Sequence, residues 1–186
     1  MGSEKTADWY DEYYRQHPDP SPELTAIHDM VADLVIAHGV SLVSDVGCGP
    51  GWFVDRLATQ GYRGEYLGVD FSRVAVERAN HAVRRTEAVG VFGGAWVGSL
   101  GSTRTQLDLG VVVAVEVLEH LADDVVTFDR IVPAGRRVVI SVPTYDSESH
   151  VRWFAETDDV KGRYGVRGVQ FVKDRQIYVS GVKVAR

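Results

Sequence analysis

Short β-type runs alternate with amphipathic helical stretches along most of this chain, and this alternation constrains the fold more than any other feature. Such alternation is typical of parallel strands joined by crossover helices. The expected strands are residues 41–46, 65–70, 95–97, 107–115, 137–142, 169–173 and 177–184, and the expected helices between the first five are about 52–60, 73–85 and 119–132. The last two strands are separated by only Asp174, Arg175 and Gln176, too few residues for a crossover, so they should form an antiparallel hairpin. We therefore predict an α/β protein with a doubly wound, mostly parallel seven-stranded sheet that ends in this hairpin.

The chain is predicted to hold one domain, residues 21–186, preceded by an N-terminal segment, residues 1–20. A length of 186 residues is enough for one substantial core. The sequence HPDPSPE at residues 17–23 is the only proline cluster and is typical of a hinge. Ser21 and Pro22 suit the N-cap and the first position of a helix, whose apolar residues recur at helical spacing until Gly39.

Composition and charge exclude several classes of protein. The net charge of −6 and the pI near 5.5 provide no basic surface for a phosphate backbone, which disfavours a nucleic-acid substrate, although a local arginine cluster could still bind RNA. The longest apolar run, Leu109–Val115, is too short to cross a membrane, and the polar, acidic start does not resemble a secretory signal, so we expect a cytoplasmic protein. The single cysteine, Cys48, cannot form an internal disulfide and is expected to be a packing residue.

The most specific motif is a glycine-rich turn, VSDVGCGPGW, between the first expected strand and the helix after it. Glycines at 47, 49 and 51 leave the backbone open to a ligand and permit positive φ. A dinucleotide-binding loop would place its third glycine at position 52, where this chain has Trp52. The motif therefore departs from the pyrophosphate fingerprint and suits an uncharged ribose with an amino-acid tail.

In this turn the chain resembles class I S-adenosylmethionine-dependent methyltransferases, which have a Rossmann-like fold. The sequence Asp45-Val-Gly-Cys-Gly-Pro-Gly51 is similar to their first motif. The resemblance implies S-adenosylmethionine as cofactor, with Asp45 holding its ammonium group directly or through water. It also implies that Gly47, Cys48 and Gly49 line the cofactor near the sulfonium.

Four further residues are assigned to the nucleoside. Asp70 ends the second expected strand, 70 − 45 = 25 residues after Asp45, near the spacing of about 20 at which related folds bind ribose hydroxyls. It could instead cap the next helix, a role that Ser72 could also fill. Phe71 could pack on adenine or be an ordinary core aromatic. Where the family often has Gly-Asp, the chain aligns Gly98-Ser99-Leu100, so Ser99 and Leu100 are expected at the adenine, although residues 92–96 offer a second register.

The segment AVEVLEHL, residues 114–121, is similar to the segment that follows the fourth strand of these enzymes. Glu116, Glu119 and His120 should lie on the reactive face and allow three interpretations. His120 could be a general base while Glu116 supports the methionine end, or the three residues with His150 could bind a divalent metal, as in small-RNA 2′-O-methyltransferases and some quinone-pathway O-methyltransferases. The third interpretation is a helix start with an exposed His120. We assign His120 and His150 as catalytic candidates and leave the metal open.

Two segments are candidates for contact with the methyl acceptor. One is the connection after the fifth expected strand, residues 141–154, with Tyr145, His150, Arg152 and Trp153. The N-terminal segment carries Trp9, Tyr10, Tyr13 and Tyr14, which predict either a lid over the cofactor or a helix docked on the edge of the sheet.

The sequence as a whole predicts methyl transfer from S-adenosylmethionine to an oxygen or nitrogen of a small molecule. Three alternatives remain: a metal-assisted RNA 2′-O-methyltransferase, a nicotinamide-dependent oxidoreductase disfavoured by Trp52, and a silent cofactor-binding partner of another subunit. The acceptor, the methylated atom and the oligomeric state are left open.

Overall fold

A computed structural model describes residues 2–98 and 110–185, and in these residues seven strands form one sheet. The strand order is β3-β2-β1-β4-β5-β7-β6. Neighbouring strands among β1 to β5 are parallel, whereas β7 pairs antiparallel with both β5 and β6. The strands are β1 (Leu42–Val46), β2 (Gly64–Asp70), β3 (Val91–Val97), β4 (Val111–Val115), β5 (Arg137–Pro143), β6 (Val166–Lys173) and β7 (Gln176–Lys183). The predicted doubly wound sheet with its C-terminal hairpin is confirmed.

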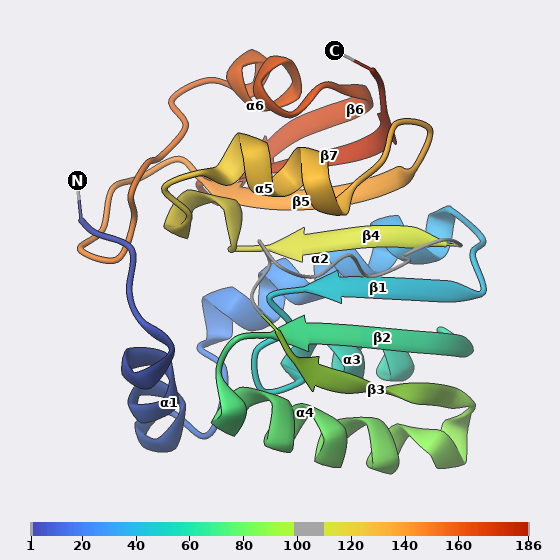
Figure 1. Cartoon of the computed structure of the whole chain (residues 1–186). Coiled ribbons are helices and arrows are strands. Elements are labelled where there is room, and N and C mark those ends of the chain that lie inside the picture. The colour runs from blue at the N-terminus through green and yellow to red at the C-terminus, as the bar shows by residue number, and fades with distance from the viewer. Residues whose placement is uncertain (1, 99–109, 186) are drawn as a thin grey trace.

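Helices cover both faces of the sheet (Figure 1). They are α1 (Ala7–Gln16), α2 (Pro22–Ala37), α3 (Trp52–Thr59), α4 (Arg73–Thr86), α5 (Asp124–Ile131) and α6 (Thr157–Tyr164), with short 3-10 turns η1 (Glu87–Val89) and η2 (Leu118–His120). Apolar side chains of α2, α3 and α4 form one core against β1, β2 and β4, and those of α5 and α6 form a second core against β4, β5 and β7. Every residue of β4 is buried because this central strand has a core on each side.

Ser21 caps α2 as predicted, accepting a hydrogen bond from the Leu24 amide at 3.1 Å, and Pro22 occupies the first turn. Among the described residues, no helix is both long and apolar enough to span a bilayer.

Two elements differ from the sequence prediction. The single helix expected over 119–132 is divided into η2 and α5, because Arg152 binds the carbonyls of Leu118, Leu121 and Ala122 and so fixes a non-helical connection. Strand β3 begins at Val91, four residues earlier than expected, because Gly93 and Gly94 hide its β pattern.

Helix α6 was not predicted, since its exposed face is polar and only Val160 and Tyr164 of its described side chains are buried. Ser99 and Leu100, together with residues 107–109 of the expected fourth strand, lie outside the described residues.

Candidate functional site

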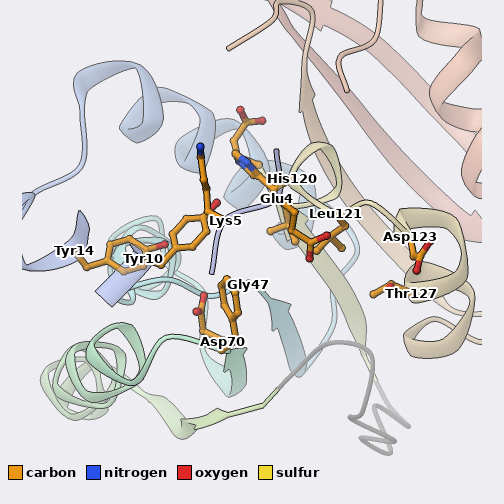
Figure 2. A pocket seen from close by; sticks show the side chains of 13 residues that line it. Glu4, Lys5, Tyr10, Tyr14, Gly47, Asp70, His120, Leu121, Asp123 and Thr127 are labelled. Atoms are coloured by element: carbon orange, nitrogen blue, oxygen red, sulfur yellow. The ribbon is translucent and has the colours of Figure 1, made fainter. Parts of the chain in front are cut away.

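A cavity of about 250 Å³ lies at the carboxyl ends of β1, β2 and β4. Helix α1 lies beyond the tips of these strands (Figure 1). In doubly wound sheets this is the position of the ligand crevice. The cavity has walls from three parts of the chain: the strand ends, the N-terminal segment, and the connection around η2 (Figure 2). Its lining residues are Glu4, Lys5, Tyr10, Tyr14, Gly47, Asp70, Phe71, Glu116, Val117, His120, Leu121, Asp123 and Thr127.

The glycine turn closes the cavity below the end of β1. Gly47 has a φ of 72°, and the amides of Gly47 and Cys48 donate to the Val69 carbonyl at 2.8 and 3.1 Å, which ties the turn to β2. A Cβ atom at position 47 would lie 2.5 Å from Cγ2 of Val117, another lining residue. Position 47 therefore requires glycine both for its backbone conformation and for space.

Asp70 lies beside this turn with its carboxylate partly engaged by the backbone. Its Oδ2 accepts the Gly49 amide at 3.0 Å and its Oδ1 accepts the Ser72 amide at 2.9 Å. Ser72, rather than Asp70, is the N-cap of α4, because its Oγ accepts the Ala75 amide at 3.0 Å. Burial raises the pKa of Asp70, while the backbone amides oppose that shift. Each carboxylate oxygen can accept a second hydrogen bond, so Asp70 keeps acceptor capacity toward the cavity.

Asp45 is placed differently from Asp70. It is buried beneath the turn, does not line the cavity, and its Oδ2 accepts the hydroxyl of Tyr66 at 2.6 Å. Burial raises the pKa of Asp45 to about 7. Cys48 and Gly49 also lie behind the lining, and burial raises the pKa of the Cys48 thiol, as fits a packing residue.

The N-terminal segment is docked over the cavity. Asp11 accepts the Ser72 hydroxyl at 2.5 Å and the Val74 amide at 3.1 Å, which joins α1 to the start of α4. Tyr10 lies 5.3 Å from Phe71 between ring centroids, and Figure 2 shows the rings of Tyr10 and Tyr14 above Gly47 and Asp70. Two of the four aromatic residues expected to cover the site, Tyr10 and Tyr14, thus line the cavity.

Glu116 directly follows β4 and has a backbone conformation that is unusual for its residue type. Its φ of 54° lies in the left-handed region, which costs a non-glycine residue about 1 kcal/mol or more and is found most often at functional sites. Its carboxylate accepts the Ser141 hydroxyl at 3.1 Å and the Gln176 amide at 3.3 Å. Burial raises the pKa of Glu116 to about 7. The strained backbone directs a partly buried acid to the cavity wall.

Behind Glu116, the side chains of Glu119, His120 and His150 come together. One ligand-type atom from each lies within 4.8 Å of the others. Glu119 is fully buried and His120 is 20% exposed, so the interpretation of this segment as an exposed helix start is wrong. Burial and then the charge of Glu116 raise the pKa of Glu119, and burial lowers the pKa of His120 to about 4. Burial also lowers the pKa of His150.

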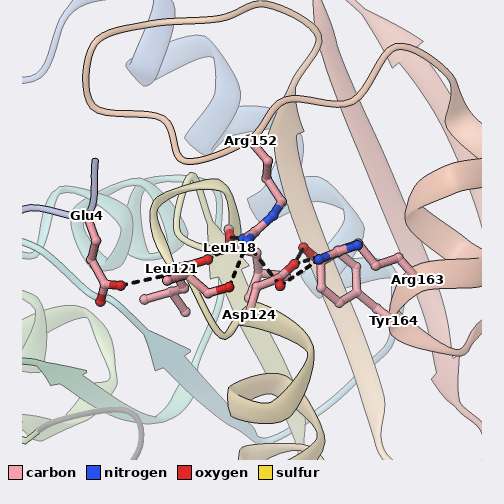
Figure 3. Close-up of polar contacts among 8 residues, drawn as sticks. Glu4, Leu118, Leu121, Asp124, Arg152, Arg163 and Tyr164 are labelled. Atoms are coloured by element: carbon pink, nitrogen blue, oxygen red, sulfur yellow. Dashed lines mark hydrogen bonds and ion pairs between the residues drawn. The ribbon is translucent and has the colours of Figure 1, made fainter. Parts of the chain in front are cut away.

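Arg152, a candidate for contact with the methyl acceptor, is engaged by the protein itself. Its guanidinium donates to the carbonyls of Leu118, Leu121 and Ala122 and lies 3.3 Å from Asp124 (Figure 3). Asp124 also receives two hydrogen bonds from Arg163, at 2.7 and 2.8 Å. This network fixes the connection that carries His120, so Arg152 supports the site instead of contacting a ligand.

Several solved structures with the same fold are methyltransferases. A SAM-dependent methyltransferase from Aquifex aeolicus superposes with a TM-score of 0.70 at 16% identity, covering 97% of this chain and 100% of that one. Magnesium protoporphyrin IX methyltransferase from Synechocystis, solved with bound SAM, gives 0.68 at 20% identity, covering 94% and 90%. The N-methyltransferase NodS from Bradyrhizobium japonicum, in complex with S-adenosyl-L-homocysteine, gives 0.65 at 19% identity, covering 90% of each chain. At these identities the likeness establishes the fold.

Sequence comparison identifies the domain. Residues 44–134, from β1 past the end of α5, match a family model described as a methyltransferase domain. These residues form a methyltransferase domain, and the sheet that carries them has the class I methyltransferase fold. The two neighbours from Synechocystis and Bradyrhizobium japonicum were solved with S-adenosylmethionine or S-adenosylhomocysteine, which supports S-adenosylmethionine as the cofactor of this domain and disfavours the nicotinamide-dependent alternative. A search of curated protein sequences finds no match to this methyltransferase.

The structure brings together five of the predicted site residues of this methyltransferase in one cavity lining: Gly47, Asp70, Phe71, Glu116 and His120. His150 lies behind His120, with ring centroids 5.1 Å apart. Sequence reasoning missed the lining residues Glu4, Lys5, Val117, Leu121, Asp123 and Thr127. No local pattern marks these residues, because they reach the cavity only through the docking of the N-terminal segment and the break between η2 and α5.

Proposed function

We propose that this methyltransferase transfers the methyl group of S-adenosylmethionine to an oxygen or nitrogen of a small-molecule acceptor. The observation that carries the proposal is the small volume of the cavity, about 250 Å³. Its walls come from the N-terminal segment and the η2 connection as well as from the strand ends. Such a space suits a small acceptor better than a polymer. The net charge of −6 also disfavours a nucleic-acid acceptor.

We place the cofactor along the ends of β1, β2 and β4. Asp70 would accept hydrogen bonds from the ribose hydroxyls, and Phe71 would pack against adenine. Gly47 would lie against the sulfonium side, with Cys48 and Gly49 shaping the turn from behind. Ser99 and Leu100 remain proposed adenine neighbours on sequence grounds alone.

Glu116 is the acid we assign to the amino-acid end of the cofactor, because its carboxylate lines the cavity whereas Asp45 does not. Asp45 would then act indirectly, by supporting the glycine turn through its bond with Tyr66. A buried carboxylate beside an ammonium group gives a strong, charge-assisted hydrogen bond.

His120 and His150 form the wall that we assign to acceptor activation. In the transfer step, a lone pair on the acceptor atom attacks the methyl carbon, the bond from carbon to sulfur breaks, and the sulfonium becomes the neutral thioether of S-adenosylhomocysteine. The acceptor proton leaves toward the histidine wall. The enzyme gains most of its rate enhancement by holding the two reactants in line and excluding water.

The function is tested by incubating the protein with methyl-labelled S-adenosylmethionine and a fractionated metabolite extract. We expect label in a small-molecule fraction and, in parallel, cofactor binding by calorimetry. A separate incubation with RNA covers the alternative acceptor. Label recovered in RNA alone would overturn the small-molecule assignment, and saturable cofactor binding without transfer to any acceptor would identify a silent cofactor-binding subunit instead.

We further propose that residues 1–20 act as a lid that opens to admit the cofactor. The segment is held by a few polar contacts, including the Arg78 guanidinium, which donates to the carbonyls of Tyr14, His17 and Pro18. Loss of those bonds should favour the open state by about 1.4 kcal/mol, or tenfold.

The lid is tested by trypsin cleavage after Arg15, whose side chain is exposed. We expect Arg78→Ala to speed this cleavage about tenfold and S-adenosylhomocysteine to slow it in the wild type. The control is Arg84→Ala, which removes another arginine of α4 whose guanidinium lies 3.0 Å from Nδ1 of the exposed His81. Cleavage that is equally fast in both variants and unaffected by S-adenosylhomocysteine would show that α1 is a fixed part of the domain.

A further inference from the structure

A second cavity lies between the proline cluster at residues 17–23 and helices α3 and α4, and we call it the hinge cavity. Its volume is about 550 Å³, and its walls include residues 18–20, Pro50 and side chains of α3 and α4. No described residue lines both this cavity and the cofactor cavity. The proposed transfer site therefore does not account for this space.

The lining of the hinge cavity is positively charged on balance. Three of its described lining residues are arginines: Arg56 from α3, and Arg78 and Arg85 from α4. Against them stand two carboxylates, those of Asp19 and Asp55. The whole protein has a net charge of −6, and a concave positive surface on such a protein concentrates anions locally. The hinge cavity is thus a local arginine cluster of the kind that the overall charge did not exclude.

Two of these arginines keep hydrogen-bond donors for a ligand. Arg56 donates through Nε to Asp29 at 2.5 Å, and Arg85 donates through one terminal nitrogen to Asp55 at 2.7 Å. A guanidinium has five N–H donors, so in the described part of the chain most donors of both groups are left over. The Arg85 side chain is 62% exposed and can turn toward a ligand without moving the core. A phosphate group fits this arrangement, because its several oxygens can accept from two guanidinium groups at once.

An aromatic ring lies beside these cations. The indole of Trp52 lines the cavity, and its Nε1 donates to the Pro18 carbonyl at 3.3 Å, which holds the ring in the wall. The Arg78 guanidinium lies 5.9 Å from the indole centroid. Aromatic rings provide a face on which nucleobases stack, while arginines bind the attached phosphates. The combination indicates a nucleoside phosphate as the ligand.

Arg78 connects the hinge cavity to the N-terminal segment. The same guanidinium that lines the cavity donates to carbonyls at the end of α1 and just after it, those of Tyr14, His17 and Pro18. A phosphate carries a full negative charge and a peptide carbonyl carries none, so a bound phosphate competes well for Arg78. Binding of the anion would weaken the contacts that hold the segment in place.

We propose that the hinge cavity binds a nucleoside diphosphate and that this ligand releases the N-terminal segment by competing for Arg78. The phosphates would lie among Arg56, Arg78 and Arg85, with the base against Trp52. The ligand takes no part in methyl transfer, and its role is to regulate access to the cofactor cavity. The binding site stands apart from the proposed function, whereas the release of the segment rests on the proposed lid.

The first test is calorimetric titration of the full chain with pyrophosphate, which has the phosphates of the ligand but no nucleoside that could enter the cofactor cavity. We expect one saturable site per chain. Arg85→Ala should weaken pyrophosphate binding about tenfold through the loss of a charge-assisted contact. Asp55→Asn should tighten it, because the change removes a carboxylate from the wall and frees the Arg85 guanidinium.

The matched control is Arg84→Ala, which removes the same charge from the residue next to Arg85 in α4. Arg84 does not line the cavity, so pyrophosphate affinity should stay within about twofold of the wild type. Absence of saturable pyrophosphate binding would overturn the proposal. So would an equal loss of affinity in Arg84→Ala and Arg85→Ala, since that result indicates a diffuse field instead of a site. Circular dichroism confirms that each variant is folded.

Adenosine diphosphate tests the place of the base. In the presence of saturating S-adenosylhomocysteine, which occupies the cofactor cavity, it should bind more tightly than pyrophosphate. Trp52→Leu should remove this advantage and leave pyrophosphate affinity unchanged. Equal affinity for the two probes in the wild type would overturn the nucleoside assignment. An RNA oligonucleotide that binds more tightly than adenosine diphosphate, and loses affinity in Arg85→Ala, would assign the cavity to a nucleic-acid backbone instead.

Trypsin cleavage after Arg15 tests the release of the segment. Saturating pyrophosphate should speed this cleavage in the wild type and have no further effect in Arg78→Ala, which already lacks the contacts of that guanidinium. Pyrophosphate that binds without speeding cleavage in the wild type would refute the release and leave the binding site in place. If Arg78→Ala without any ligand is cleaved no faster than the wild type, the proposed lid is refuted, and calorimetry alone decides the binding site.

Discussion

Replacing Asp70 with alanine is expected to weaken S-adenosylmethionine binding about 100-fold. The variant loses the acceptor that we assign to the ribose hydroxyls, and hydrogen bonds to a charged group contribute about 1.5–3 kcal/mol each. A total near 3 kcal/mol corresponds to about two orders of magnitude in Kd. It also frees the amides of Gly49 and Ser72, which Asp70 holds at 3.0 and 2.9 Å, so the glycine turn loses its support. Calorimetric titration with S-adenosylmethionine and S-adenosylhomocysteine measures the effect.

The matched control is Asp55→Ala, which removes the same atoms from α3. Asp55 forms a partly exposed ion pair with Arg85 at 2.7 Å and does not line the cavity. Its removal should leave cofactor affinity unchanged. If a folded Asp70→Ala protein bound the cofactor within threefold of the wild type, the ribose assignment would be wrong.

The second large effect is on stability. Asp124→Ala is expected to lower the free energy of unfolding by about 3–5 kcal/mol, because it breaks a buried charge network and leaves the partners of Asp124 without an acceptor. Asp124 is 2% exposed and accepts hydrogen bonds from Arg163 and from the Tyr164 hydroxyl, the latter at 2.7 Å. For a domain of this size the loss corresponds to a fall in Tm of about 10 °C. Thermal and urea unfolding measure it.

Asp55→Ala is again the control, since an exposed ion pair contributes at most about 1 kcal/mol. The pH dependence provides a second check. Burial raises the pKa of Asp124, but its hydrogen bonds with Arg163 and Tyr164 and the charges of Arg152 and Arg163 outweigh burial, so the net pKa is lowered. The stabilisation is then complete above the ordinary carboxyl pKa near 3.9 and is lost as the pH falls through the lowered value. A gap between wild type and variant that widened in acid would contradict this account.

Much of the fold followed from sequence because local signals agreed with the tertiary structure. The apolar run of β4 reads as a strand buried on both faces, and Ser21 with Pro22 marks the start of α2. The hydrophobic pattern gave a wrong prediction where contacts between residues far apart in the sequence determine the local structure. Arg152, about 30 residues away along the chain, interrupts the helix expected over 119–132, and no periodicity within that segment signals it.

The candidate site shows the same division. The position of Asp70 and Gly47 in the cavity lining was predictable, because strand ends and glycine turns have fixed places in a doubly wound sheet. Asp45 was placed at the ligand from its motif position, yet in the structure it lies beneath the turn on Tyr66, a partner 21 residues away that the motif does not contain. Glu4 and Lys5 reach the cavity because α1 docks across it, and this docking depends on Asp11 meeting the first turn of α4.

The seating of the extreme N-terminus has a practical consequence for handling the enzyme. The Gly2 amide donates to the His150 carbonyl at 2.8 Å, and a Cβ at this position would lie 1.8 Å from the Glu148 carbonyl oxygen. An affinity tag fused ahead of Gly2 would be attached next to these contacts with residues 148–150 and could disturb them. Purification handles therefore belong after β7, whose end lies at the far side of the sheet (Figure 1).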